Sequence, residues 1–152
     1  MRNNSTQTDI VPQSDELSKK AFKKLRQLHR EKLPLERVPT YRDKTANGLT
    51  KCIIDYLNLK GYQAERILCM GVPVPVGNGT YTMGKTTMDL GTADVSATIK
   101  SLSIKIEIKA GNDKMSSHQW DYKRRIEKAG GIYIIARTFP QFLIELHRRV
   151  KI

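Results

Sequence analysis

The chain has 152 residues, of which 39% are hydrophobic and 28% are charged, a composition typical of a soluble globular protein. The 27 Lys and Arg residues exceed the 15 Asp and Glu residues, and the formal net charge of +12 favours a polyanionic partner. No apolar run reaches the length of a membrane-spanning helix and the polar N-terminus has no apolar signal region, so we expect a cytoplasmic protein with no membrane partner. Cys52 and Cys69 are too few for a disulfide framework, and we expect reduced thiols.

The first 40 residues read as an extension of the main domain. Residues 1–14 are polar and are expected to be disordered. A basic helix is predicted from Asp15 to about Lys32, with a stripe formed by Leu17, Ala21, Leu25 and Leu28. Three roles stay open for this helix: docking on the domain through its stripe, binding DNA, or binding a partner.

The compact domain is expected to span residues 41–152. The elements predicted in it are a helix from about Ala46 to Gly61, a strand at 62–67, a Gly/Pro-rich connection at 68–92, two strands around 95–109, a helix after Ser116, a strand at 132–136 and a helix opening at Pro140. This order predicts an α/β fold with a small mixed sheet of about four strands flanked by helices.

The two strands at 95–109 carry an unusual set of charges. Apolar residues alternate with polar ones along both strands, and a tight loop is predicted at Ser101-Leu102. In that register Asp94 lies opposite Lys109 and is a diagonal neighbour of Glu107, roughly 7–8 Å away at the backbone. Two carboxylates and a lysine on one face can hold Mg²⁺ against a phosphodiester, which predicts a nuclease. The competing interpretation is a solvated outer face with interleaved charges.

A basic helix follows the hairpin. Ser116 and Gln119 fit the N-cap and N3 positions of a capping box. Trp120 is expected in the core, although it and Tyr122 could also stack on bases. Four basic side chains further along the helix are predicted to line a phosphate-binding face: Lys123, Arg124, Arg125 and Lys128.

These motifs together resemble the PD-(D/E)xK nuclease superfamily, and more narrowly its VRR-NUC branch, which is related to Holliday-junction resolvases. The resemblance is carried by the segment GTADV ending at Val95, by KIEIKAG at 105–111, and by the helix residues from Ser116 to Gln119. It extends from about Thr45 to Ala136 and implies a restriction-endonuclease-like core.

The resemblance implies a role for each motif residue. Asp94, Glu107 and the carbonyl of Ile108 would ligate a divalent metal, Mg²⁺ or Mn²⁺, which would activate water and neutralise the phosphate. Lys109 would orient the attacking water or stabilise phosphate charge, and Gln119 would support that lysine. The predicted function is a Mg²⁺-dependent DNA endonuclease, with branched DNA as a candidate substrate and a homodimer as a candidate assembly, in a prokaryotic or phage-infected cell.

One position departs from the family pattern. The family often carries a glutamate on its first helix, where the best match here is Asn47. Asn47 brings no charge, which leaves open a site with one metal or a catalytically inactive domain that binds nucleic acid or has a structural role.

A second motif competes with the nuclease interpretation. The segment from Gly79 to Thr86 matches the P-loop pattern G-x-x-x-x-G-K-[ST] in full. A P-loop needs a central strand before it, which Pro73 and Pro75 exclude, and a helix after it, for which too few residues remain before Gly91. We therefore expect no nucleotide cofactor, and Lys85 is instead a candidate for DNA contact.

Overall fold

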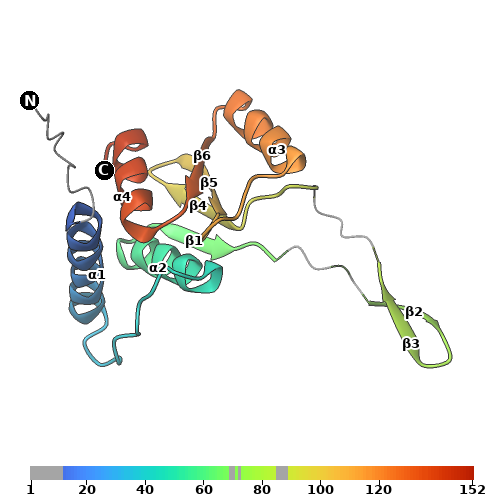
Figure 1. Cartoon of the computed structure of the whole chain (residues 1–152), viewed down its shortest axis with the longest axis horizontal. Coiled ribbons are helices and arrows are strands. Elements are labelled where there is room, and N and C mark those ends of the chain that lie inside the picture. The colour runs from blue at the N-terminus through green and yellow to red at the C-terminus, as the bar shows by residue number, and fades with distance from the viewer. Residues whose placement is uncertain (1–11, 69–70, 72, 85–88) are drawn as a thin grey trace, which may run out of the picture.

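The main sheet has four strands in the order β1-β4-β5-β6 (Figure 1). The computed structural model describes residues 12–68, 71, 73–84 and 89–152. The strands of this sheet are β1 (Gln63–Arg66), β4 (Val95–Ile99), β5 (Leu102–Ile108) and β6 (Ile132–Ala136). Because β5 and β6 are parallel while the other two pairs are antiparallel, the sheet is mixed. The predicted α/β class with a mixed four-stranded sheet is thus confirmed.

Helices cover both faces of this sheet (Figure 1). The helices are α1 (Pro12–Lys32), α2 (Ala46–Leu59), α3 (Ser117–Lys128) and α4 (Phe139–Arg149). Alternation along β5 sends Ile104, Ile106 and Ile108 into the core that α1, α2 and α4 complete. On the other face, Tyr122 of α3 packs with Ala93 and Tyr133 in a second, smaller cluster.

The basic N-terminal helix α1 docks on α2 and α4. Leu25 is fully buried and Ala21 is 7% exposed, so both belong to the same core as the sheet. Leu17, at the start of the predicted stripe, is 49% exposed. Helix α1 therefore docks through the middle of its apolar stripe. The domain boundary predicted at residue 40 stays a prediction.

The β4–β5 hairpin forms in a register that differs from the predicted one. Ile99 pairs with Leu102, so the loop is Lys100-Ser101 and not Ser101-Leu102. Both loop residues have positive φ, 47° and 69°, as a type I′ turn requires. The observed register differs from the predicted one by two residues along one strand. Because side chains alternate with period 2, every side chain keeps its predicted face.

The predicted connection at 68–92 contains an unexpected hairpin. Its strands are β2 (Pro73–Gly77) and β3 (Thr80–Met83), joined through Asn78 and Gly79, which both have positive φ. The middle of the P-loop pattern is therefore an exposed strand. Lys85, the lysine of that pattern, lies outside the described residues, as do Cys69 and residues 1–11.

No helix in the described part of the chain has an apolar stretch long enough to cross a bilayer. Cys52 is a free, buried thiol, and burial raises its pKa to about 12.

Candidate active site

The predicted acidic residues meet where β4 begins and β5 ends. Val95 pairs with Ile106, so the adjoining residues Asp94 and Glu107 stand opposite one another, closer than the predicted diagonal. The Asp94 carboxylate accepts a hydrogen bond from the backbone N–H of Ile108 at 2.8 Å. Asp94 is thereby fixed at the end of β5, beside Glu107.

Glu107 is the centre of a buried polar network. Its side chain is on the α3 face of the sheet and the residue is only 2% exposed. Oε1 accepts a hydrogen bond from Nε2 of Gln119 at 2.6 Å and lies 3.2 Å from the ammonium of Lys109. Oε2 accepts a hydrogen bond from the hydroxyl of Tyr133 at 3.3 Å. Three side chains, one from α3, one from β6 and one from the residue after β5, therefore hold one carboxylate.

Gln119 serves two functions at once. Ser116 and Gln119 form the predicted capping box, in which Oε1 of Gln119 accepts a hydrogen bond from the backbone N–H of Ser116 at 2.9 Å. The Nε2 group of the same amide donates to Glu107. The helix N-terminus and the carboxylate are therefore coupled through one side chain.

Lys109 lies just beyond β5 and is 5% exposed. Its ammonium bridges Glu107 and Asp113, at 3.2 Å from a carboxylate oxygen of each. Its backbone N–H donates to the carbonyl of Ala136, the last residue of β6. The lysine is thus anchored at both ends, and its charge points toward the two acids.

Burial, and next the charge of Asp94, raise the pKa of Glu107 from an ordinary value of 4.5 to about 7, although Lys109 and Tyr133 lower it. Burial, followed by the charge of Glu107, also raises the pKa of Tyr133. The phenol therefore remains protonated at neutral pH and acts as a donor to Glu107.

These burials contradict the solvated-face interpretation of the hairpin. An outer face with interleaved charges would leave Glu107 and Lys109 in water, whereas both are almost completely covered. Lys105, one pleat away, is half-buried and donates to the hydroxyl of Ser96 at 2.6 Å. Only charges that are paired and hydrogen-bonded tolerate such burial.

The donor set fits a small hard cation. Asp94 and Glu107 supply two neighbouring carboxylates, and repulsion between them would be relieved by a positive ion. The N–H and C=O of one strand residue point to the same side, so the carbonyl of Ile108 faces the Asp94 side together with its N–H. Within the described residues, no three His, Cys, Asp or Glu side chains are grouped to hold a metal. Two carboxylates and one carbonyl suit Mg²⁺ or Mn²⁺, which retain several waters.

Sequence reasoning missed two members of the network, Tyr133 and Asp113. Tyr133 has the one hydroxyl in an otherwise apolar strand, which could have suggested a polar partner on the sheet. Asp113 lies four residues after Lys109, but the loop conformation that brings them together leaves no sequence pattern. Asn47 lies exposed in the first turn of α2, and its consequence for a metal site stays a prediction.

The basic side chains of α3 are largely paired with acids. Lys123 bonds to Glu127 at 2.6 Å, and Arg125 reaches Asp89 at 2.9 Å in the loop before β4. Arg124 pairs with Asp121, and Lys128 is exposed near the helix end. Their role as a phosphate-binding face stays a prediction.

Trp120 contradicts its predicted place in the core. Its side chain is 45% exposed, whereas Tyr122, two residues later, is buried against Tyr133. Helical geometry turns positions 120 and 122 to different faces, and only Tyr122 meets the sheet.

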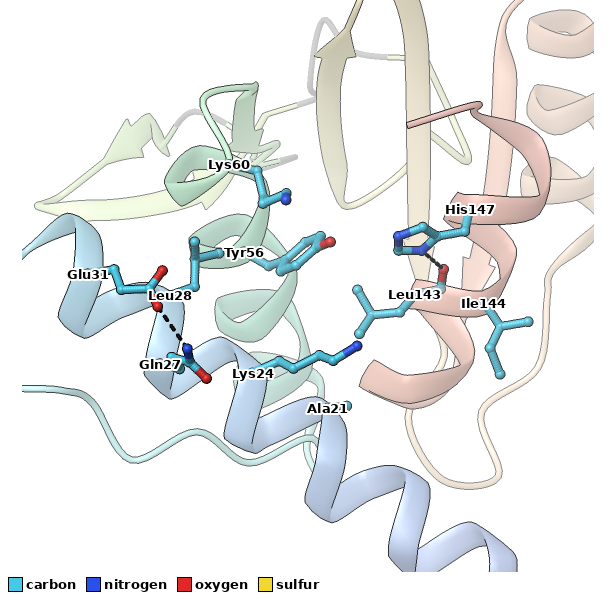
Figure 2. Close-up of a pocket in the computed structure, with 10 residues that line it drawn as sticks. All are labelled: Ala21, Lys24, Gln27, Leu28, Glu31, Tyr56, Lys60, Leu143, Ile144 and His147. Atoms are coloured by element: carbon cyan, nitrogen blue, oxygen red, sulfur yellow. Dashed lines mark hydrogen bonds between the residues drawn. The ribbon is translucent and has the colours of Figure 1, made fainter.

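A separate pocket lies on the other side of the sheet, between α1, α2 and α4 (Figure 2). It measures about 840 Å³ and is lined by Lys24, Lys60 and His147 around apolar side chains. Nδ1 of His147 contacts the carbonyl of Leu143 in its own helix, and the other bond drawn joins Gln27 to Glu31 within α1. None of the predicted site residues lines this pocket.

No protein-family model and no curated protein matches this sequence. The resemblance to the PD-(D/E)xK nucleases therefore remains a prediction from the motif residues.

Proposed function

We propose that this protein is a metal-dependent endonuclease that hydrolyses DNA phosphodiester bonds at the cluster of Asp94, Glu107 and Lys109. The observation that carries the proposal is the burial of Glu107 and Lys109, at 2% and 5% exposure, beside a second carboxylate. Perturbed carboxylates with a lysine partner occur preferentially at functional sites. The membership that we propose is in the VRR-NUC branch of the PD-(D/E)xK nucleases.

Apolar residues of similar volume often stabilise a fold as well as a buried ion pair does. A buried ion pair stabilises a fold little, because the desolvation of both charges offsets their attraction. Here the arrangement also includes Asp94, whose charge acts against that of Glu107. Such a cost is expected where the carboxylates have a further ligand.

In this proposal Asp94, Glu107 and the carbonyl of Ile108 hold Mg²⁺ or Mn²⁺. The bound cation supplies charge neutralisation at the phosphate and lowers the pKa of water. Gln119 and Tyr133 keep the Glu107 carboxylate oriented from both of its oxygens. Lys109 places one further positive charge where negative charge develops on the phosphate.

The charge of the whole chain supports a nucleic-acid substrate. A net charge of +12 attracts a polyanion and releases counterions on binding. We assign the phosphate contacts outside the cluster to Lys123, Arg124, Arg125 and Lys128 on α3, with Lys85 as a further candidate. A homodimer would present two sites to opposite strands of branched DNA.

Cleavage of labelled duplex, branched and single-stranded DNA tests the proposal. We expect the wild type to cut at least one substrate with Mg²⁺ or Mn²⁺ and none with EDTA, and Glu107→Ala to be inactive. Glu145→Ala, which removes a glutamate of α4 from the opposite layer, is the matched control and should retain activity. Binding without cutting by the wild type under every metal would instead favour the catalytically inactive, nucleic-acid-binding alternative.

A further inference from the structure

A recess of about 470 Å³ lies beside the buried cluster, because its lining residue Ile135 is the register partner of Glu107 on the neighbouring strand β6. It lies where the parallel strands β5 and β6 end, beside the start of α3. The carboxyl ends of parallel strands are where ligands bind in open α/β sheets. The lining side chains come from the loop before α3, from α3, from the end of β6 and from α4: Lys114, Met115, Trp120, Ile135, Arg137 and Gln141.

Two connections tie this recess to the cluster. Arg137 follows β6 directly, and its guanidinium donates to the carbonyl of Asp113 at 3.1 Å and to that of Lys109 at 3.5 Å. Trp120 follows Gln119, whose amide binds Glu107 at 2.6 Å. A nucleotide with its phosphate at the cluster would therefore bring its neighbouring base or sugar to the recess.

The chemistry of the recess suits a nucleobase. Trp120 is 45% exposed, and Met115 and Ile135 provide partly buried apolar surface beside it. Lys114 and Arg137 are exposed cations at the same recess. An aromatic face with flanking cations is the combination that proteins use to stack bases and hold the adjoining phosphates.

Gln141 gives the recess a fixed wall. Its Oε1 accepts a hydrogen bond from the backbone N–H of Arg137 at 2.9 Å, and its Nε2 donates to the carbonyl of Ile135 at 3.2 Å. The side chain thus joins α4 to the end of β6. The recess is preformed on three elements and does not depend on one loop.

We propose that this recess binds an unpaired nucleobase next to the phosphate at the cluster, with Trp120 stacking on the base. A paired base in a duplex already stacks on both neighbours, and removing it costs a few kcal/mol. The inference rests on the proposed nuclease function and gives that function a substrate class: DNA that is single-stranded or locally unpaired at the cutting position.

Trp120 is the only tryptophan of the chain, so protein fluorescence reports directly on the recess. We would titrate the wild type in EDTA with a single-stranded oligonucleotide, with an abasic oligonucleotide of equal length and charge, and with a duplex. Quenching by the ordinary single strand, with little or none by the abasic strand, is the expected result. Equal quenching by both strands, or no quenching by either, overturns the inference.

Variant affinities add a second readout through the anisotropy of a labelled oligonucleotide. Trp120→Ala should weaken single-strand binding by about tenfold, whereas Trp120→Phe should retain most of it. Ile144→Ala, a change at an exposed side chain of α4, is the control and should bind like the wild type. An unchanged affinity of Trp120→Ala contradicts the stacking role.

The two proposals fail in different ways. A wild type that cuts DNA with Mg²⁺ but shows no base-dependent quenching refutes the base site and leaves the nuclease in place. A wild type that shows the quenching but cuts nothing refutes the nuclease and supports the base site on a binding protein.

Discussion

The neighbours of Glu107 act in opposite directions on the pKa of its carboxyl group. Burial and the neighbouring Asp94 favour its neutral form, while Lys109 and the Tyr133 hydroxyl favour the charged form, and the pKa settles at about 7. Near neutral pH this residue is therefore divided between its two protonation states unless a cation is present. Its pH behaviour, its oxygen partners and the metal affinity that we propose all follow from the same environment.

The pH dependence of stability follows from this pKa. Between 4.5 and about 7 the folded state binds more protons at Glu107 than the unfolded state, so the free energy of unfolding falls as pH rises. The stabilisation present at acid pH is lost through this window, by about 3 kcal/mol if the full shift applies. Because the amide introduced by Glu107→Gln cannot titrate, that variant should lack this loss.

Urea unfolding in chelator, at several pH values from about 4.5 to 8, measures the difference between wild type and Glu107→Gln. The stability of the variant should rise relative to the wild type as pH increases. Glu145→Gln is the control, since ion pairing with Arg148 holds the pKa of Glu145 below its ordinary value and outside this window. A wild-type-minus-variant difference that is constant with pH would contradict the assigned pKa.

Tyr133→Phe tests the second oxygen of Glu107. The change removes the donor to Oε2 but keeps the ring that packs against Tyr122 at 6.2 Å between centroids. We expect Mn²⁺ affinity to fall by about tenfold or more, because groups that orient a metal ligand affect affinity to that extent. Calorimetric titration with Mn²⁺ measures it. Tyr41→Phe removes a similar donor, to Asp55 at 3.0 Å, and should leave metal affinity unchanged.

At the scale of elements, the turn before β4 positions the start of α3. Gly91 has φ of +82°, and a Cβ on it would lie 2.3 Å from the carbonyl oxygen of His118 and 2.6 Å from the backbone nitrogen of Gln119. The GTAD segment and the capping box are therefore in direct backbone contact. This contact determines where the amide of Gln119 meets Glu107.

Gly91→Ala should displace the N-terminus of α3 and weaken the Gln119–Glu107 bond. Gly61→Ala is the matched control, since Gly61 has φ of +81° and open space around its added Cβ. Both variants place an alanine at positive φ and are strained for that reason. Only Gly91→Ala is also overpacked, which should lower its free energy of unfolding by about 1–3 kcal/mol more. Urea unfolding measures the free energy of unfolding of each variant. Titration with Mn²⁺ measures the effect of a weakened Gln119–Glu107 bond on metal binding. Equal losses in both variants would contradict the positioning role.

Local rules predicted most elements of this fold, and their failures have physical causes. The Ser116–Gln119 capping box was predictable from its residue types and spacing, and the strand at 132–136 from its continuous run of apolar residues. The turn at Lys100-Ser101 was missed because neither residue favours positive φ, and the flanking strand register imposes it. The β2–β3 hairpin was missed because its prolines, Pro73 and Pro75, argue against a strand, although they fit an exposed two-stranded one.

The candidate site was predictable only in part. The strand register named Asp94, Glu107 and Lys109, whereas a site role for Gln119 came only from the resemblance to the nuclease family. The structure brings all four together. Their burial could not be predicted, because it depends on the packing of α3 over the sheet. Tyr133 lies far from Glu107 in the sequence, and only the parallel pairing of β5 with β6 brings the two residues together.

At the scale of the whole molecule, basic residues occupy both helical layers, and the proposed function assigns DNA to only one of them. Helix α3 covers the face of the sheet that carries Glu107, whereas α1 lies on the opposite side of the sheet with α2 and α4 (Figure 1). Counterion release makes the salt dependence of binding a measure of how many phosphates the protein neutralises. The two layers can therefore be compared directly.

Neutralising Lys123, Arg124, Arg125 and Lys128 together should flatten the salt dependence of DNA binding. On single-stranded DNA the slope of log K against log salt should fall in magnitude by about 0.7 for each phosphate that is no longer neutralised. The matched control neutralises four exposed lysines of α1: Lys19, Lys20, Lys23 and Lys24. Anisotropy titrations over a range of salt measure both. An unchanged slope for the α3 set, or a larger decrease for the α1 set, would contradict the assigned face.

The proposed mechanism depends on one divalent cation held by Asp94 and Glu107. Calorimetric titration of Mn²⁺ into the wild type and Glu107→Gln is the most direct test of this cation site. We predict one Mn²⁺ for each wild-type chain, with affinity increasing as pH rises past about 7 and Glu107 loses its proton, and no such site in the variant. Equal binding by both proteins, or none by the wild type, would contradict the metal site and with it the nuclease mechanism.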